Sequence, residues 1–213
     1  LSYRFHPRSQ RIKAMVNDGS IGKPHLIRSA FCFNMGEELL QSGNNARLKP
    51  DMGGGALMDV GCYSVSMARW ILDAEPEIVQ AQALYHKSGV DQHFIGSLRF
   101  PNDLLATLEA SFITALQQTY TVVGTKGVIE LPHDAYIPWE KDAVFTVRSK
   151  YEEIGRVHST PGADGYKLMI EHFAELVLGR ESPLYAPEDS IGTMQVLDAL
   201  ARAARTGKSL KVN

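Results

Sequence analysis

Asp59 and Tyr63 are the residues of this 213-residue chain whose types and spacing best suit catalysis. They follow the run Gly53-Gly54-Gly55, which leads into a predicted helix. Positions four apart in a helix share one face, so the carboxylate and the phenol would point the same way. Such a pair suits proton transfer to or from a substrate hydroxyl or carbonyl. A free phenol titrates near pH ~10, so Tyr63 would need a nearby cation, and no lysine accompanies the pair locally.

Each of these candidate residues also has a purely structural interpretation. Asp59 would stabilise the helix N-terminus, and Tyr63 would be a buried tyrosine with a satisfied hydroxyl. Arg47, in the polar loop before the glycines, either binds substrate hydroxyls or a carboxylate, or is a solvated loop side chain. His172, in a later helix, is either a substrate-binding residue or a structural histidine.

Neither a metal site nor a dinucleotide site is predicted within the chain. Its seven histidines and two cysteines have no metal-ligand spacing. No GxGxxG sequence follows a strand and opens a helix, so we expect no cofactor-binding residue here. The loop at 124–127 lacks the length of a phosphate-binding loop and is predicted to be a hairpin turn.

The composition is typical of an ordinary globular protein, with 44% hydrophobic and 22% charged residues. The net charge of −2 argues against nucleic acid or an anionic membrane as a partner. Cys32 and Cys62 suggest two reduced thiols, and no apolar stretch reaches the roughly 20 residues of a membrane helix. We therefore expect a cytoplasmic protein. Because it begins with Leu1, we also expect a segment of a longer chain or a processed product.

The hydrophobic pattern predicts a single α+β domain over residues 1–213. Helices are expected at 7–17, 59–72, 166–178 and 189–205, with a long loop at 36–55. Strands are expected at 26–34, 77–85, 92–100, 104–113, 119–123, 128–131 and 143–149. The short connections favour antiparallel pairing. The predicted fold is a large, open, mostly antiparallel β-sheet with helices packed on one face.

Several stretches resemble the C-terminal half of the Gfo/Idh/MocA oxidoreductases. These include glucose–fructose oxidoreductases, NADP-dependent xylose dehydrogenases and dihydrodiol dehydrogenases. The matching stretches, in chain order, are residues 3–7, 19–24, 53–63, 124–127 and 166–173. The resemblance implies the family's C-terminal fold, a domain like that of dihydrodipicolinate reductase. It also implies an N-terminal Rossmann domain that binds NAD or NADP and supplies a lysine from a Glu-Lys-Pro motif. This chain is expected to lack that domain and to be inert in isolation.

Carried over by resemblance, Tyr63 matches the proton-transferring residue, which is histidine in many relatives, and Asp59 the acid that orients it. Arg47 and Tyr3 match positions that line the substrate and nicotinamide region. With His172 they form the predicted substrate-binding set. The sequence thus predicts the substrate-binding and oligomerisation domain of an NAD(P)-dependent oxidoreductase that acts on a sugar or polyol.

Two alternatives remain open, together with a prediction about assembly. One alternative is a non-catalytic dimerisation or sugar-binding module. The other is a reductase of the same fold that acts on a non-sugar substrate. An open sheet has one broad face to cover, so we expect a homodimer, or a dimer of dimers, through that face.

Overall fold

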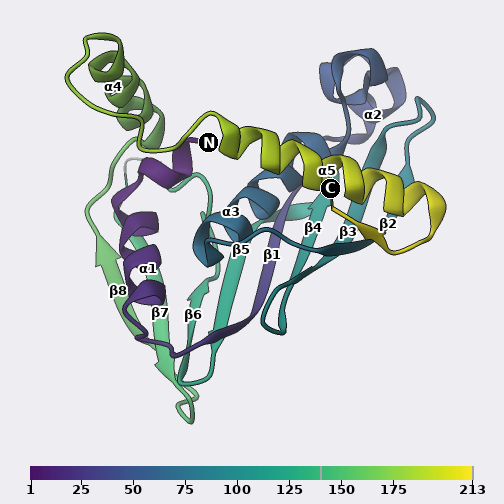
Figure 1. Ribbon diagram of the computed structural model, residues 1–213. Coiled ribbons are helices and arrows are strands. Elements are labelled where there is room, and N and C mark those ends of the chain that lie inside the picture. The colour runs from purple at the N-terminus through teal and green to yellow at the C-terminus, as the bar shows by residue number, and fades with distance from the viewer. Residues whose placement is uncertain (140, 213) are drawn as a thin grey trace. The chain divides into compact units, whose positions relative to one another are not determined.

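The computed structural model describes residues 1–139 and 141–212. In that part of the chain, strand pairing gives one nine-stranded sheet in the order β8-β7-β6-β5-β1-β4-β3-β2-β9 (Figure 1). The strands are β1 (Pro24–Asn34), β2 (Ile78–Tyr85), β3 (Asp91–Phe100), β4 (Leu104–Ser111), β5 (Ile113–Gly124), β6 (Gly127–Leu131), β7 (Ala143–Ser149), β8 (Arg156–Thr160) and β9 (Leu210–Lys211). β1 and β4 pair in parallel, whereas β2–β3, β3–β4, β5–β6, β6–β7, β7–β8 and β2–β9 are antiparallel. The predicted open, mostly antiparallel sheet is confirmed.

Five α-helices and several shorter helical turns occur within the described residues. The α-helices are α1 (Pro7–Asn17), α2 (Glu37–Ser42), α3 (Cys62–Leu72), α4 (Gly165–Val177) and α5 (Glu188–Thr206). The shorter turns are η1 (Ser2–Phe5), η2 (Ala46–Leu48) and η3 (Pro50–Met52), which are 3₁₀, and η4 (Leu57–Gly61), which is π. The loop expected at 36–55 therefore contains α2 and two 3₁₀ turns. The helix expected from residue 59 begins instead as a π turn at Leu57.

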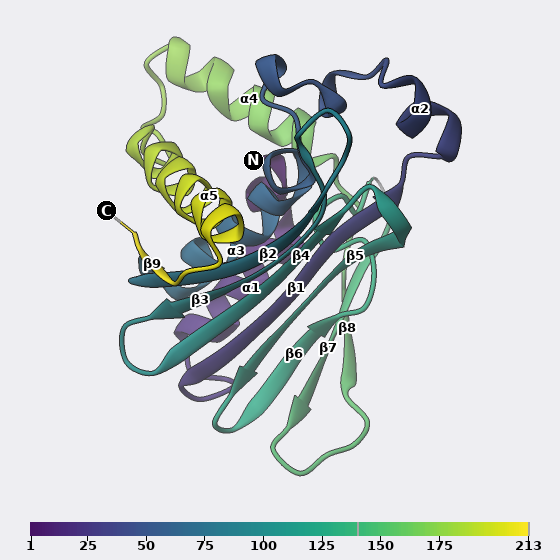
Figure 2. The ribbon, with the colours of Figure 1, turned by 90° about the vertical axis from the view of Figure 1, so that its right-hand side faces the viewer.

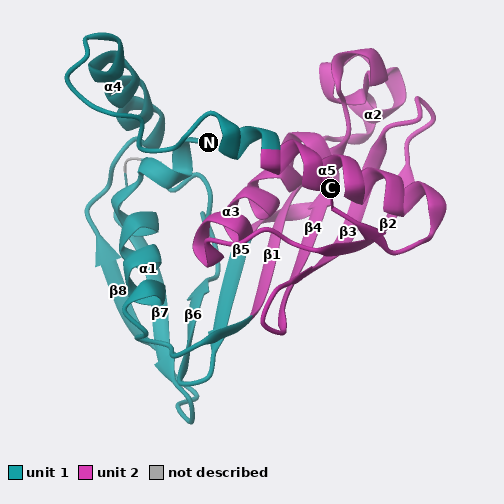
Figure 3. Cartoon of the chain, viewed as in Figure 1, with its two compact units in different colours: residues 1–25, 119–191 teal, residues 26–118, 192–213 magenta. Residues whose placement is uncertain are grey.

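The chain forms two compact units, shown in different colours in Figure 3. Unit 1 comprises residues 1–25 and 119–191, and unit 2 comprises residues 26–118 and 192–213. No shift in composition marks these boundaries, and the single-domain organisation stays a prediction.

Unit 2 is a sheet of neighbouring strands with helices on one face (Figures 1 and 2). Residues alternate along β4, so that Ala106, Leu108 and Ala110 are buried while the residues between them are more exposed. Gly96 of β3 lies under Leu200 of α5, where a Cβ atom would be crowded by the leucine. The core is made by the inward residues of the strands and by α3 and α5: Val65, Ile71, Val79, Phe94, Leu98, Val196, Leu197 and Leu200.

Unit 1 contains α1 beside strand β8, together with η1 and α4. His6 caps α1, accepting a hydrogen bond on Nδ1 from the backbone N–H of Arg8 at 3.1 Å. The guanidinium of Arg8 is buried and donates to the carbonyl oxygens of Asp134 and Ala135. Thr125 and Lys126 form the turn between β5 and β6, which confirms the predicted hairpin. None of the helices in the described residues is long and apolar enough to cross a membrane.

Candidate active site

The glycine run folds back onto the loop that carries Arg47. The backbone N–H of Gly54 donates to the carbonyl of Lys49 at 3.0 Å, and that of Gly55 donates to the carbonyl of Arg47 at 2.9 Å. A Cβ atom on Gly54 would collide with both carbonyl oxygens, so only glycine allows this close approach. The run therefore fixes the loop. Because these two N–H groups already have acceptors, they do not fit a pyrophosphate site.

The π turn η4 begins beside a carboxylate from another element. Asp91, the first residue of β3, accepts a hydrogen bond on Oδ2 from the backbone N–H of Leu57 at 2.7 Å. Burial raises the pKa of Asp91, whereas the backbone N–H groups of Leu57 and Ala56 act to lower it. Asp91 belongs to no motif or apolar pattern in the sequence, because its role depends on a contact with a residue 34 positions away.

Asp59 lies in the π turn and forms an ion pair with Arg47. Nε of Arg47 donates to Oδ2 of Asp59 at 2.7 Å. The two side chains are 46% and 26% exposed, so the pair borders solvent. The Arg47 guanidinium also lies over the ring of Phe33, 5.9 Å from its centroid. The sequence placed both residues in one site but did not predict that they are partners.

Tyr63 lies in the first turn of α3, directly after the π turn. It is half-buried, and its ring packs edge-on against Phe31 of β1 with the centroids 5.2 Å apart. Its neighbour Cys62 is a free thiol whose pKa is raised to about 11, first by burial and then by the charge of Asp59. A thiol with that pKa is protonated near neutral pH, which leaves Tyr63 and Asp59 as the proton-transfer candidates of this segment.

Tyr3 lies in unit 1 and is buried there. Its ring packs edge-on against Tyr136 with the centroids 5.7 Å apart. Its hydroxyl accepts a hydrogen bond from Nε of Arg4 at 3.5 Å. The same guanidinium donates from Nη1 to Asp189 at 2.6 Å. The predicted substrate contact of Tyr3 stays a prediction.

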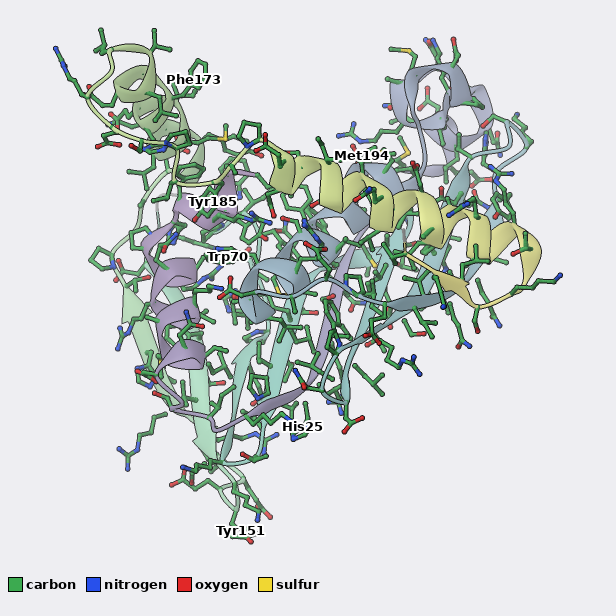
Figure 4. All side chains as sticks on the ribbon, in the orientation of Figure 1. His25, Trp70, Tyr151, Phe173, Tyr185 and Met194 are labelled. Carbon is green, nitrogen blue, oxygen red and sulfur yellow. The ribbon has the colours of Figure 1, made fainter. Side chains whose placement is uncertain are left out.

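His172 also lies in unit 1, on α4. Its Nδ1 is 2.6 Å from a carboxylate oxygen of Glu181, and its Nε2 accepts from the backbone N–H of Leu184 at 3.2 Å. Its ring also contacts Phe5, and Phe5 in turn packs against Tyr185, which is labelled in Figure 4. Both ring nitrogens thus hold the segment that follows α4. A substrate-binding role for His172 stays a prediction.

The two units thus carry different parts of the predicted set. Arg47, Asp59 and Tyr63 are brought together in unit 2, on the η2 loop, the π turn and α3. Within the described part of the chain, no group of three or more His, Cys, Asp or Glu side chains is arranged to hold a metal ion. The arrangement in unit 2 combines a phenol, a carboxylate and a guanidinium, which suits hydroxyl binding and proton transfer.

Comparison with known proteins decides the family. Residues 9–130 match the GFO/IDH/MocA C-terminal domain. This chain is a member of the GFO/IDH/MocA family. It is similar to D-xylose 1-dehydrogenase (NADP(+)) 2 of Haloferax volcanii, with 30% identity over 213 residues, covering 99% of this chain and 63% of that protein. It is also similar to trans-1,2-dihydrobenzene-1,2-diol dehydrogenase of Xenopus tropicalis, with 28% identity, covering 92% of this chain and 58% of that protein.

Solved structures of oxidoreductases have the same fold as this GFO/IDH/MocA chain. An aldose–aldose oxidoreductase from Caulobacter crescentus, complexed with glycerol, superposes with a TM-score of 0.83 and 24% identity, over 99% of this chain and 62% of that one. A 3-ketoreductase from Actinomadura kijaniata, in complex with NADP and TDP-benzene, gives a TM-score of 0.85 and 23% identity, over 95% and 60%. The chain thus spans about three fifths of the length of the relatives that it matches.

Proposed function

We propose that this chain is the substrate-binding domain of an NAD(P)-dependent oxidoreductase that acts on a sugar or polyol. The observation that carries the proposal is the grouping of Tyr63, Asp59 and Arg47 around the π turn. Single π turns inserted in helices are frequent at functional sites. The xylose dehydrogenase of Haloferax volcanii, the relative that matches 99% of the chain, supports a sugar substrate.

In this proposal the chain's own residues bind the substrate and move a proton. Arg47 and Asp59 form a partly exposed ion pair, which presents donors and acceptors to substrate hydroxyl groups. Tyr63, in its phenolate form, takes the proton of the hydroxyl group that is oxidised, and the phenol so formed returns the proton in the reverse direction. The ring contact with Phe31 restricts the orientation of the phenol. Asp59, four residues before Tyr63, holds Tyr63 in place in this proposal.

In this proposal the dinucleotide binds to another domain of the full protein and not to this chain. The glycine run does not fit a pyrophosphate, because its N–H groups bind the carbonyls of Arg47 and Lys49. We therefore propose an N-terminal Rossmann domain that holds NAD or NADP and supplies both the hydride acceptor and a lysine near Tyr63. The choice between NAD and NADP belongs to that domain. The chain alone is expected to be inert.

The decisive experiment replaces Tyr63 by Phe in the full-length protein. Loss of the hydroxyl should lower kcat by about 10² or more, since general acid–base catalysis contributes about 10²–10⁴. Turnover is followed as formation of reduced nicotinamide. Tyr151→Phe, at a side chain that is 87% exposed in unit 1, should leave kcat unchanged. Near-normal turnover of Tyr63→Phe would exclude the proton-transfer role.

A panel of substrates separates sugar from non-sugar chemistry. The Xenopus tropicalis relative is a dihydrodiol dehydrogenase, so an aromatic trans-dihydrodiol is tested beside D-xylose, other aldoses and simple polyols. The highest kcat/KM on an aldose would support the proposal. A higher kcat/KM on the dihydrodiol would instead support an enzyme of the same fold that acts on a non-sugar substrate. If the full protein oxidises none of these with either cofactor, the non-catalytic module becomes the better interpretation.

We further propose that unit 2 forms a homo-oligomer through the bare face of its sheet. Leu84, Ile95 and Leu105 lie on that face and are 59%, 48% and 51% exposed. A cavity of about 590 Å³ opens on it, lined in part by Gln82 and Thr107. Exposed large apolar side chains on one face of a sheet are compatible with a surface covered by a partner.

A further inference from the structure

Asp91, which belongs to none of the motifs in the sequence, hydrogen-bonds to the first turn of the segment that carries Asp59 and Tyr63. Asp91 comes from β3, and the segment that it contacts is the π turn η4. Oδ2 of Asp91 accepts a hydrogen bond from the backbone N–H of Leu57 at 2.7 Å. The first N–H groups of a helix have no partner inside the helix, and a side-chain acceptor is one of the groups that can satisfy them.

Gly55 leaves the space that Asp91 occupies. Its φ of +122° is a conformation that L side chains rarely adopt, and a Cβ atom built on it would overlap the carboxylate of Asp91. The third glycine of the run is therefore matched to Asp91. A side chain at position 55, or a longer one at position 91, would displace the other residue.

Three hydrogen bonds link this contact to the candidate active site. Asp91 binds the N–H of Leu57 at the start of the π turn. The N–H of Gly55 binds the carbonyl of Arg47 at 2.9 Å, and the Arg47 guanidinium binds Asp59 at 2.7 Å. A shift of the turn relative to β3 would therefore move Asp59 and Arg47 together, and Tyr63 after them.

We infer that Asp91 is a positioning residue, whose carboxylate sets the place of the π turn and thereby the geometry of Asp59, Arg47 and Tyr63. This inference rests on the proposed function. Displacement of a catalytic group by about 1 Å can cost about 10² in rate, so positioning acts on kcat more than on overall folding. If the contact served stability alone, its loss would lower the free energy of unfolding and leave kcat unchanged in the folded protein.

The test compares two substitutions of Asp91 that differ in shape, in the full-length protein. Asp91→Asn keeps the length of the side chain and one acceptor oxygen, and Asn is as good an N-terminal cap as Asp. Asp91→Glu keeps the charge but is one methylene longer, so it pushes the turn away. Asp103→Asn is the matched control, because Asp103 is exposed in the β3–β4 turn of the same unit and Asn tolerates its φ of 61°.

Positioning predicts a clear order of kcat values. Asp91→Asn should retain kcat within about fivefold, and Asp91→Glu should lose at least about tenfold, with KM for the substrate within about threefold in both. These assays are run well below the midpoint of thermal unfolding of each variant. Equal kcat for Asp91→Glu and the wild type would overturn the inference. So would an Asp91→Asn variant as impaired as Asp91→Glu, since charge and not position would then matter.

The Tyr63→Phe variant separates this inference from the proposed function. If Tyr63→Phe loses turnover while Asp91→Glu keeps it, only the positioning role fails. If Tyr63→Phe turns over normally, the proposed function itself fails. A folded Asp91→Glu protein is confirmed by its circular dichroism. If Asp91→Glu does not fold while Asp91→Asn does, the role of Asp91 is that of folding, and the inference is overturned.

Discussion

At the scale of single residues, His6 shows how burial selects one protonation state. Its Nδ1 accepts from the N–H of Arg8, so in the neutral ring Nε2 carries the proton. Burial, assisted by the nearby Arg8 cation, lowers the pKa of His6 to about 4. The folded protein therefore favours neutral His6, whereas the unfolded chain binds a proton near pH ~6.5.

This difference predicts how stability depends on pH. Between pH ~6.5 and pH ~4 the unfolded chain binds more protons, so the free energy of unfolding falls as the pH falls. We expect His6→Asn, which keeps a capping oxygen but does not titrate, to remove on the order of 2 kcal/mol of that fall. Urea unfolding at several pH values measures it. His25→Asn, at an exposed histidine labelled in Figure 4, should leave the slope as in the wild type. If the free energy of unfolding of His6→Asn still falls with decreasing pH as steeply as that of the wild type, the lowered pKa of His6 in the folded protein would be contradicted.

The candidate active-site residues were predictable in type but not in their partners. The glycine run and the spacing of Asp59 and Tyr63 are visible in the sequence. The ion pair of Asp59 with Arg47 joins residues 12 apart across two turns, and no sequence periodicity encodes it. Asp91 is further still in sequence, and only the pairing of β3 beside η4 brings it to Leu57.

At the scale of elements, a buried arginine joins α3 to α5 within unit 2. Arg69, near the C-terminal end of α3, has a side chain that is 4% exposed. Its Nε and Nη2 donate to the two carboxylate oxygens of Glu75 at 2.6 Å and 2.5 Å. Its Nη1 donates to the hydroxyl of Thr193 on α5 at 2.6 Å. A planar guanidinium is the only side chain that satisfies all three acceptors together.

We expect both Arg69→Met and Arg69→Lys to destabilise the protein. Arg69→Met should lower the free energy of unfolding by about 2 kcal/mol, because a buried guanidinium loses its charge-assisted hydrogen bonds to Glu75 and Thr193, although Glu75 itself is 62% exposed. Lysine cannot donate two parallel hydrogen bonds to the carboxylate of Glu75, so Arg69→Lys should recover less than half of that loss. Urea denaturation is the measurement. Arg180→Met, where the arginine is 65% exposed and 3.4 Å from Glu175, should change the value by less than about 0.5 kcal/mol. Equal effects at the two arginines would refute this.

Element positions followed from the sequence wherever one face of the element is buried. The α1 and β7 boundaries agree with the expected 7–17 and 143–149, since Pro marks the helix start and a run rich in Val, Phe and Thr marks the strand. β8 was missed because four of its five residues keep some exposure and give no alternation. β9 has two residues, too few for any pattern. The π turn was missed because an α-helical period and a single wider turn look alike in sequence.

At the scale of the whole molecule, the bare sheet face of unit 2 is the surface proposed above for self-association. On β3, Gly96 faces α5 while Ile95 faces away from the helices. Ile95 pairs with Gln82 on β2 and with Glu109 on β4, so an apolar side chain sits among polar ones. Mixed surfaces of this kind are typical of protein–protein interfaces, in which an apolar centre is ringed by polar groups.

Self-association through this face predicts the effect of a single charge. Ile95→Lys would place an ammonium group at the centre of the interface in both copies, where burial of like charges is unfavourable. The wild-type protein should sediment as a dimer or larger at micromolar concentration, and Ile95→Lys should sediment as a monomer. Val157→Lys is the matched control, since Val157 is an apolar strand residue, 69% exposed, on β8 of unit 1. A monomeric wild type, or an Ile95→Lys variant that still associates, would rule out this face as the interface.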